Sequence, residues 1–217
     1  MPTSTEREMP LVELRFSANE LELDLAQVFK LLKLPRQHPQ AEEWRRRIAA
    51  VVPRVRERLE PKAQYRIVPI EARLPERQTV VLAGEARFTG RGVYRRLAGC
   101  RHAAAFLLTL GHRLDSSLRQ CNQDDPLDGY LSDCVAAAFT HSVLRRIERE
   151  VRQWAEARRL QLTPRYSPGY HGWPLQDQRP LFSLLQTETM NVKLNDQFFM
   201  IPQKSVSGIW GLKPEKA

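Results

Sequence analysis

The stretch 127-LDGYLSDCVAAAFTHSVLRRIEREVRQWAEARRL-160 predicts the longest helix of the chain. Apolar residues recur there at every fourth position, which places them along one face of a helix. A stripe of this kind is typical of a helix packed against a hydrophobic core, not of a cofactor site. The stripe consists of Leu127, Leu131, Val135, Phe139, Val143, Ile147 and Val151.

Shorter helices and strands surround this segment in an irregular order, which favours an α+β fold. No GxGxxG follows a strand, so a Rossmann fold is disfavoured. Pro53 is expected to break or kink the second helix, and Pro69 argues against a central position for the first strand. Helices are expected over 20–34 with Asp24 as cap, 41–59, 91–99, 112–121 and 175–187, and strands over 63–74, 78–88, 101–111 and 191–212.

With 217 residues the chain has room for one large domain or two small ones. We expect a flexible lead-in over 1–19, a single domain over 20–212 and a tail over 213–217. No apolar run is long enough to span a bilayer, and no secretory signal is evident at the N-terminus. The three cysteines are widely spaced and imply no disulfide framework, so a cytoplasmic location is expected.

The formal net charge of +9 would attract nucleic acid, an acidic partner or an anionic cofactor. The charge is spread over helical stretches such as 45–58 and 145–159, which is typical of solvated helix faces. No compact nucleic-acid-binding motif is present. Nucleic-acid binding therefore stays a minor alternative, which predicts steeply salt-dependent affinity.

The segment 165-RYSPGYHGWPLQDQRPLF-182 concentrates proline, glycine and aromatic residues directly after the long helix. Arg165 can hold a carboxylate through two hydrogen bonds, and the prolines on either side of it keep the backbone extended. Gly169 permits close approach of a ligand to the backbone, and Tyr170 offers a flat ring and a hydroxyl. These features suit a small zwitterion or a nucleoside-like ligand, although an ordinary structured turn would use some of them too.

RYSPGY resembles the RxxPGY segment of the activation domain of cobalamin-dependent methionine synthase, where a proline and a short helix follow, as Pro174 and 176–185 do here. A second segment, 194-LNDQFFMIPQKSVSGIWG-211, is similar to the strand pair of that family. More loosely, 101–118 and the helix from Pro126 are also similar, so the resemblance spans about 20–212 and is closest to single-domain versions. The MxPxxSVSG core of the second segment is Met200, Pro202, Ser205, Val206, Ser207 and Gly208.

The resemblance implies a twisted, mainly antiparallel sheet flanked by long helices. It also implies binding of S-adenosylmethionine, whose methyl group returns cobalamin on another protein to its active form. Arg165 would hold the ligand carboxylate, the backbone at Ser167 and Gly169 would contact the ligand, and Tyr170 would pack beside the sulfonium. Alignment of the reactants is then the protein's task, so no general acid, base or metal ligand is nominated.

The partners that the resemblance implies are a cobalamin-binding methionine synthase, or another corrinoid protein, and a flavodoxin-type electron donor. The sequence departs from the family at His141, where full-length synthases have Glu, and at 195–197, where they have TES. The paired tyrosines that those synthases place after the SVSG strand do not follow it here. His141 is therefore placed in the site, although a partly buried structural histidine is the alternative. A second hypothesis is a non-catalytic module that docks on a corrinoid protein as a chaperone or interaction partner.

Other candidate residues have simpler explanations. Asp124, Asp125 and Asp128 lie before or at the start of the long helix, where carboxylates complement the helix dipole, so capping is favoured over a metal site. His102, His112 and His171 are not at metal-ligand spacing. Trp173 is expected to pack the loop or to line a binding cleft.

Overall fold

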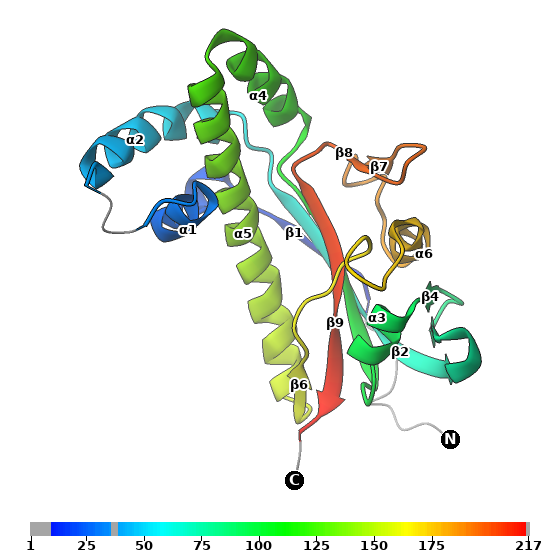
Figure 1. Cartoon of the computed structure of the whole chain (residues 1–217). Helices are drawn as coiled ribbons and strands as arrows, with labels where there is room; N and C mark the ends of the chain where they lie inside the picture. The colour runs from blue at the N-terminus through cyan, green and yellow to red at the C-terminus, as the bar shows by residue number, and fades with distance from the viewer. Residues whose placement is uncertain (1–9, 36–38, 216–217) are drawn as a thin grey trace.

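A twisted antiparallel sheet carries helices on both faces (Figure 1). The computed structural model describes residues 10–35 and 39–215. The strands there are β1 (Val12–Arg15), β2 (Lys62–Leu74), β3 (Thr79–Leu82), β4 (Arg87–Thr89), β5 (His102–Thr109), β6 (Leu160–Leu162), β7 (Lys193–Leu194), β8 (Met200–Ile201) and β9 (Ser205–Pro214). The α-helices there are α1 (Leu25–Leu31), α2 (Ala41–Glu57), α3 (Arg91–Arg96), α4 (His112–Asp124), α5 (Pro126–Glu156) and α6 (Gln178–Phe182).

The main sheet has the strand order β4-β3-β2-β5-β9-β6. Strand β1 pairs with the start of β2, up to Tyr65, and β3 pairs with the later part of β2, from Ile70. Strands β1 and β3 therefore lie on the same side of β2, at different points along it. Every pairing in it is antiparallel. Strands β7 and β8 form a separate hairpin next to the start of β9. The predicted α+β class with a mainly antiparallel sheet is confirmed.

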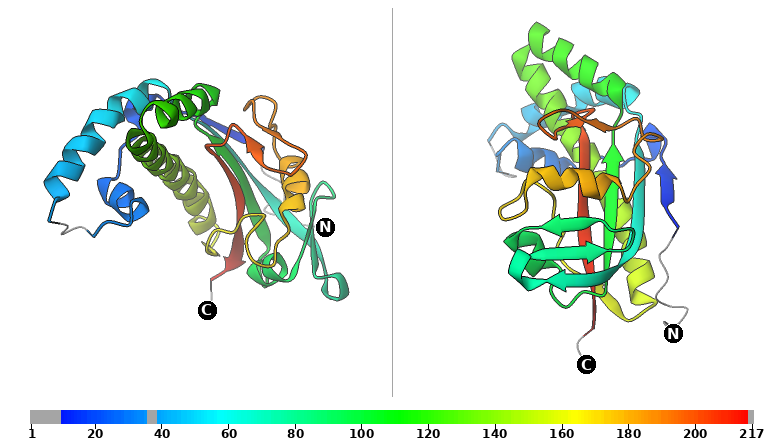
Figure 2. Two further views of the ribbon diagram at one scale, coloured as in Figure 1. Left: turned by 45° about the horizontal axis from the view of Figure 1, so that its top comes forward. Right: turned by 90° about the vertical axis from the view of Figure 1, so that its right-hand side faces the viewer.

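Strand β5 lies at the centre of the sheet, and all eight of its residues are buried. Because side chains alternate along a strand, β5 contributes to a core on each face. One core is closed by α1, α2 and α5, and the other by α3, α6 and the chain between them and β9. The left view of Figure 2 shows these layers: α2 and α1, then α5, then the sheet, then α6. Ala104, Phe106 and Leu108 face the first core, and Ala103, Ala105 and Leu107 face the second.

Helix α5 packs along the sheet as its apolar stripe predicts. Six of the seven stripe residues, from Leu131 to Val151, are buried, whereas Leu127 in the first turn is 38% exposed. Asp125 caps the helix by accepting hydrogen bonds from the N–H groups of Leu127 and Asp128, at 2.9 and 3.2 Å. Capping is therefore confirmed as the role of Asp125.

Two predicted boundaries need correction. Val12–Arg15 form strand β1, although they fall in the range 1–19 that was expected to be flexible. The reason is the alternation of apolar and polar residues there, which lets one side of the strand contact the first core. At the other end β9 continues to Pro214, because Leu160 and Gln161 of β6 pair with it there. Residues 1–9 and 216–217 lie outside the described residues.

The predicted break at Pro53 does not occur, because α2 continues through it to Glu57. A proline removes the hydrogen bond to the carbonyl four residues earlier, here that of Ala49. Both residues are exposed, so the freed carbonyl faces water. Ile48, Val51 and Val55 are buried on the other side of the helix and hold both halves against the core.

Pro69 also occupies a position that the sequence argued against, because β2 lies between other strands. Its carbonyl accepts a hydrogen bond from Ala83 N–H at 3.1 Å, which lies on the β3 side of β2. The ring nitrogen faces the same edge, where pairing with β1 has ended at Tyr65 and pairing with β3 starts at Ile70. The proline therefore removes no hydrogen bond between β2 and β5.

Candidate functional site

The chain that follows β6 continues alongside β9 as a short extended segment. Thr163 N–H donates to Gly211 O at 2.8 Å, and Tyr166 and Ile209 exchange two backbone hydrogen bonds of 3.0 and 2.8 Å. Because successive side chains of an extended chain point to opposite sides, Arg165 projects toward α5 while Tyr166 projects to the other face of the sheet.

Glycine at position 208 lets this segment lie close to β9. A Cβ at Gly208 would come within 2.6 Å of Tyr166 O and 2.7 Å of Ser167 Oγ. Ser167 is buried, and its hydroxyl donates to Ser207 O at 2.7 Å. The two segments that carry the family resemblance are thus in direct contact in the fold.

The turn after Ser167 is closed by its own backbone. Gly169, at φ +89°, donates to Trp173 O at 2.9 Å, and Trp173 N–H donates to Tyr170 O at 2.9 Å. The Trp173 ring is buried and stacks on Tyr166 with 5.6 Å between ring centroids, so Trp173 packs the loop. The turn leaves the side chain of Tyr170 50% exposed at the surface.

Arg165 and Tyr170 line a cavity of about 300 Å³ that lies between α5, the turn and the start of β9. We call this cavity the Arg165 cavity. Helix α5 forms one wall with residues one turn apart, and the chain entering β9 forms the wall opposite. The residues that line the Arg165 cavity are Ala137, Thr140, His141, Leu144, Arg165, Tyr170, Gln203, Lys204, Ser205 and Val206.

Three of the five predicted site residues, Arg165, Tyr170 and His141, thus lie in one cavity. Ser167 and Gly169 are not among its lining residues; the Ser167 side chain is turned into the sheet and Gly169 shapes the turn. Sequence reasoning missed Thr140, Gln203 and Lys204 as wall residues. Thr140 carries no signal because it is one more polar residue on a long helix, but Gln203 and Lys204 fall inside the MxPxxSVSG match and could have been named from it.

Two cations from the described part of the chain line the Arg165 cavity, and the charge of Arg165 is the one available to a ligand. Among the described residues Arg165 makes no ion pair or hydrogen bond, whereas Lys204 Nζ lies 2.7 Å from Asp133 Oδ1. Burial lowers the pKa of His141 below its ordinary value of 6.5, and the nearby positive charges of Arg165 and Arg145 lower it further. His141 is therefore neutral at pH 7, and the cavity combines one unneutralised guanidinium with neutral polar groups. Such a cavity can hold a carboxylate.

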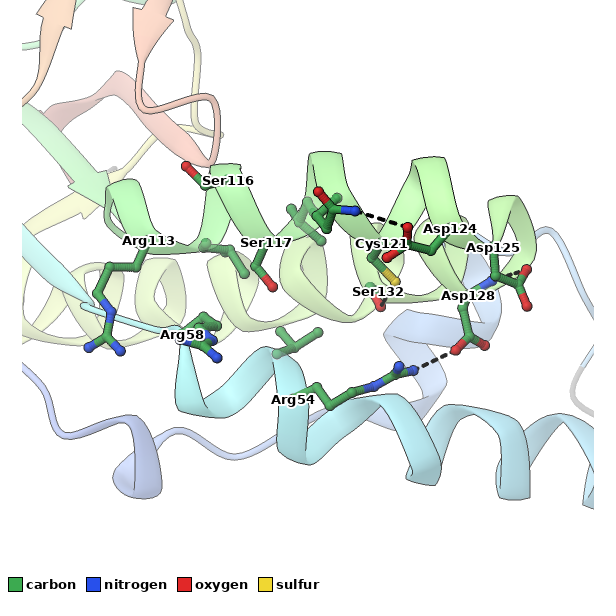
Figure 3. Close-up of a pocket in the computed structure, with 14 residues that line it drawn as sticks. Arg54, Arg58, Arg113, Ser116, Ser117, Cys121, Asp124, Asp125, Asp128 and Ser132 are labelled. Carbon is green, nitrogen blue, oxygen red and sulfur yellow. Dashed lines mark hydrogen bonds and ion pairs between the residues drawn. The ribbon is translucent and has the colours of Figure 1, made fainter.

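A larger cavity of about 590 Å³ lies elsewhere, between α2, α4 and α5 (Figure 3). Its charges are largely balanced: Arg54 lies 2.5 Å from Asp128, and Asp124 and Asp125 line the same end. Asp124 accepts a hydrogen bond from Gln120 at 2.9 Å, so none of the three predicted capping carboxylates stands alone. None of the predicted ligand-binding residues lines this cavity. Across the described part of the chain, no three His, Cys, Asp or Glu side chains converge as a metal site would need.

The fold and the Arg165 cavity define a class of protein: an α+β domain with an arginine-lined cavity between a long helix and the start of a strand of an antiparallel sheet. The family model described as the activation domain of vitamin B12-dependent methionine synthase matches residues 97–217, more than half of the chain. The chain belongs to this family, and the predicted family resemblance is confirmed.

One solved structure with the same fold is the MetH reactivation domain bound to AdoHcy. It superposes with a TM-score of 0.75 at 16% sequence identity, over 96% of this chain and 80% of that one. No curated protein matches the chain. In the part of the chain that the structure describes, no helix combines the length and apolarity needed to cross a bilayer.

Proposed function

We propose that the Arg165 cavity binds S-adenosylmethionine and that the protein supports reductive remethylation of cobalamin on a separate methionine synthase or corrinoid methyltransferase. The observation that carries the proposal is the convergence of RYSPGY and of residues 203–206, from the MxPxxSVSG segment, on one cavity with a free arginine. Family membership supports it, as does the AdoHcy bound by the structural relative, since AdoHcy is S-adenosylmethionine without its transferable methyl group.

Arg165 would hold the ligand carboxylate by two charge-assisted hydrogen bonds. Tyr170, half-exposed at the rim, would place its ring against the sulfonium, which is a favourable cation–π arrangement. A volume of about 300 Å³ covers part of a ligand of this size, so part of it would stay accessible from outside. Such access is needed because the methyl acceptor is carried by another protein.

Cobalamin held by a docked partner would supply a cobalt nucleophile for the methyl group, a flavodoxin-type donor would supply the electron that this chemistry needs, and AdoHcy would be the leaving product. This chain's residues would bind the sulfonium ligand, orient its methyl group outward and exclude water around it. Neutral His141 and Thr140 provide hydrogen-bonding groups along the α5 wall. No proton needs to move through the protein, so this role asks for no catalytic acid or base. As the family resemblance implies, the setting is methionine biosynthesis in the cytoplasm.

Calorimetric titration with S-adenosylmethionine tests the proposal. We expect saturable binding to the native chain, and a loss of affinity of about tenfold or more in Arg165→Ala, because a charge-assisted hydrogen-bonded pair is removed. Arg87→Ala is the matched control, since Arg87 is exposed on β4 and lines neither the Arg165 cavity nor the one in Figure 3. Absence of binding at millimolar ligand would contradict the proposal.

A second function is favoured by one observation: among the described residues, no carboxylate lines the Arg165 cavity. The ligand ammonium group would therefore lack an anionic partner there, at the position where the family's Glu is replaced by His141. This supports the alternative of a non-catalytic module that docks on a corrinoid protein. Co-purification with a cobalamin-binding domain distinguishes the two, because the docking module would associate with it equally well with and without S-adenosylmethionine.

A further inference from the structure

A second pocket lies on the opposite side of the segment that carries Arg165. It is shallow, with a volume of about 390 Å³, and is formed by α3, by the chain after β6 and by the end of β9. We call it the Lys213 pocket. Its lining residues are Gly92, Arg95, Arg96, Ala98, Thr163, Pro164, Tyr166 and Lys213.

Of the residues that the structure describes, three cations and no carboxylate line the Lys213 pocket. Arg95, Arg96 and Lys213 make no ion pair with any of the described residues. The cavity in Figure 3 differs in this respect, because Arg54 is paired with Asp128 there. Three uncompensated positive charges around one concave surface repel each other, and a bound anion would relieve that repulsion.

The walls of the Lys213 pocket are held in place by contacts that leave its cations free. The Arg96 guanidinium lies over the Tyr166 ring, 5.1 Å from its centroid, and Tyr166 in turn stacks on buried Trp173. Thr163 is fixed by backbone and side-chain hydrogen bonds to Gly211, of 2.8 and 2.9 Å. A binding surface organised in advance loses little entropy when a ligand binds.

We infer that the Lys213 pocket is a binding site for a phosphate group. A single carboxylate would neutralise one of the three cations, whereas a phosphate dianion or a diphosphate has the charge and the oxygen atoms to engage all three. Arginine is suited to this role because its planar donors can bind two phosphate oxygens at once. The phosphate can belong to free inorganic phosphate or diphosphate, or to a nucleotide.

The Lys213 pocket is independent of the Arg165 cavity although both use the same segment. Arg165 projects toward α5, while Pro164 and Tyr166 line the Lys213 pocket on the other side. Replacing Arg165 should therefore leave phosphate binding unchanged. The proposal of a phosphate site and the proposal of an S-adenosylmethionine site can therefore be refuted independently of each other.

Titration calorimetry at low ionic strength, with inorganic phosphate, pyrophosphate and adenosine diphosphate as separate probes, tests this inference. We expect saturable binding of pyrophosphate with one site per chain. Arg95→Ala and Lys213→Ala should each weaken it by about tenfold or more, since each removes a charge-assisted hydrogen bond. Tighter binding of adenosine diphosphate than of pyrophosphate identifies a nucleotide as the source of the phosphate, and equal or weaker binding identifies the free anion.

Arg87→Ala is the control for net charge, because it removes one exposed arginine away from the Lys213 pocket. It should bind pyrophosphate as the native chain does, and so should Arg165→Ala. The inference is overturned if none of the three probes binds saturably at millimolar concentration. It is equally overturned if Arg87→Ala weakens binding as much as Lys213→Ala does, since the attraction would then come from overall charge.

Discussion

At the scale of single residues, His141 is the most informative position of the Arg165 cavity, because the family resemblance implies a glutamate there. It lies on α5 in the wall of the Arg165 cavity, and its pKa is lowered first by burial and then by Arg165 and Arg145, against the opposing effect of Asp24. A glutamate at this position would neutralise Arg165, whereas neutral histidine leaves that charge available. The substitution therefore changes the electrostatics of the cavity without closing it.

The lowered pKa of His141 predicts a pH dependence of stability. Because the unfolded chain takes up the proton first, the stabilisation is complete above about pH 6.5 and is lost as the pH falls toward the lower folded pKa. The free energy of unfolding of the native chain, minus that of His141→Gln, should therefore decrease between about pH 7.5 and about pH 5. Urea unfolding of both chains at several pH values measures this difference in free energy. If the difference stays constant with pH, His141 titrates normally.

At the scale of elements, the Arg165 cavity depends on the contact between β9 and the segment that runs beside it. That segment is held by backbone bonds at Thr163 and Tyr166 and by the close approach at Gly208. Helix α5 supplies the wall opposite. Arg165 can point toward His141 only while the segment keeps its register on β9, so the register is part of the site.

Gly208→Ala is expected to displace this segment, because its Cβ would lie 2.6 Å from a backbone oxygen that the sheet holds in place. We expect the affinity for S-adenosylmethionine to fall by about tenfold or more, while circular dichroism still shows a folded chain. Gly84→Ala is the control: its backbone at φ +77° would be strained by about 1–2 kcal/mol, but no atom of the described residues lies within 4 Å of the added Cβ. It should lose stability and keep binding, and equal loss of binding in both variants would attribute the effect to stability alone.

At the scale of the whole molecule, one sheet is shared by two cores. Trp210 is buried in the core under α5, and Trp173 is buried in the core on the opposite face. Strand β5 contributes alternate residues to both cores, so neither core can come apart without exposing the other side of the same strand. This arrangement supports the proposal of a single domain, with the corrected bounds that include β1 from Val12 and β9 to Pro214.

The shared sheet predicts one cooperative unfolding transition. Two variants that each keep a single tryptophan, Trp173 in one and Trp210 in the other, report on one core each once the remaining tryptophans are replaced by phenylalanine. If the urea midpoint of a variant is the same by circular dichroism as by tryptophan fluorescence, the core that contains its tryptophan unfolds together with the whole sheet. A core whose fluorescence changes at lower urea than the circular dichroism of the same variant would instead be a separate folding unit.

Much of the fold and part of the site could be predicted from local sequence. The stripe on α5, the cap at Asp125 and the apolar run of β5 are short-range signals, because helix and strand periodicities act over a few residues. The predictions made from Pro53 and Pro69 were wrong because the effect of a proline is not a short-range signal. A proline's cost depends on which carbonyl or strand edge it faces, and packing at long range decides that.

The sequence by itself determined the α+β class, the family and the choice of Arg165, Tyr170 and His141 as candidates. Only the tertiary structure decided that these three meet Lys204 and Ser205 in one cavity while Ser167 turns into the sheet. Tertiary structure also placed Arg95, Arg96 and Lys213 around one pocket, although Lys213 is more than a hundred residues from the arginines in the chain. The physical reason is that antiparallel pairing with β9 brings distant segments together, and no local pattern of residues encodes which side chains then face each other.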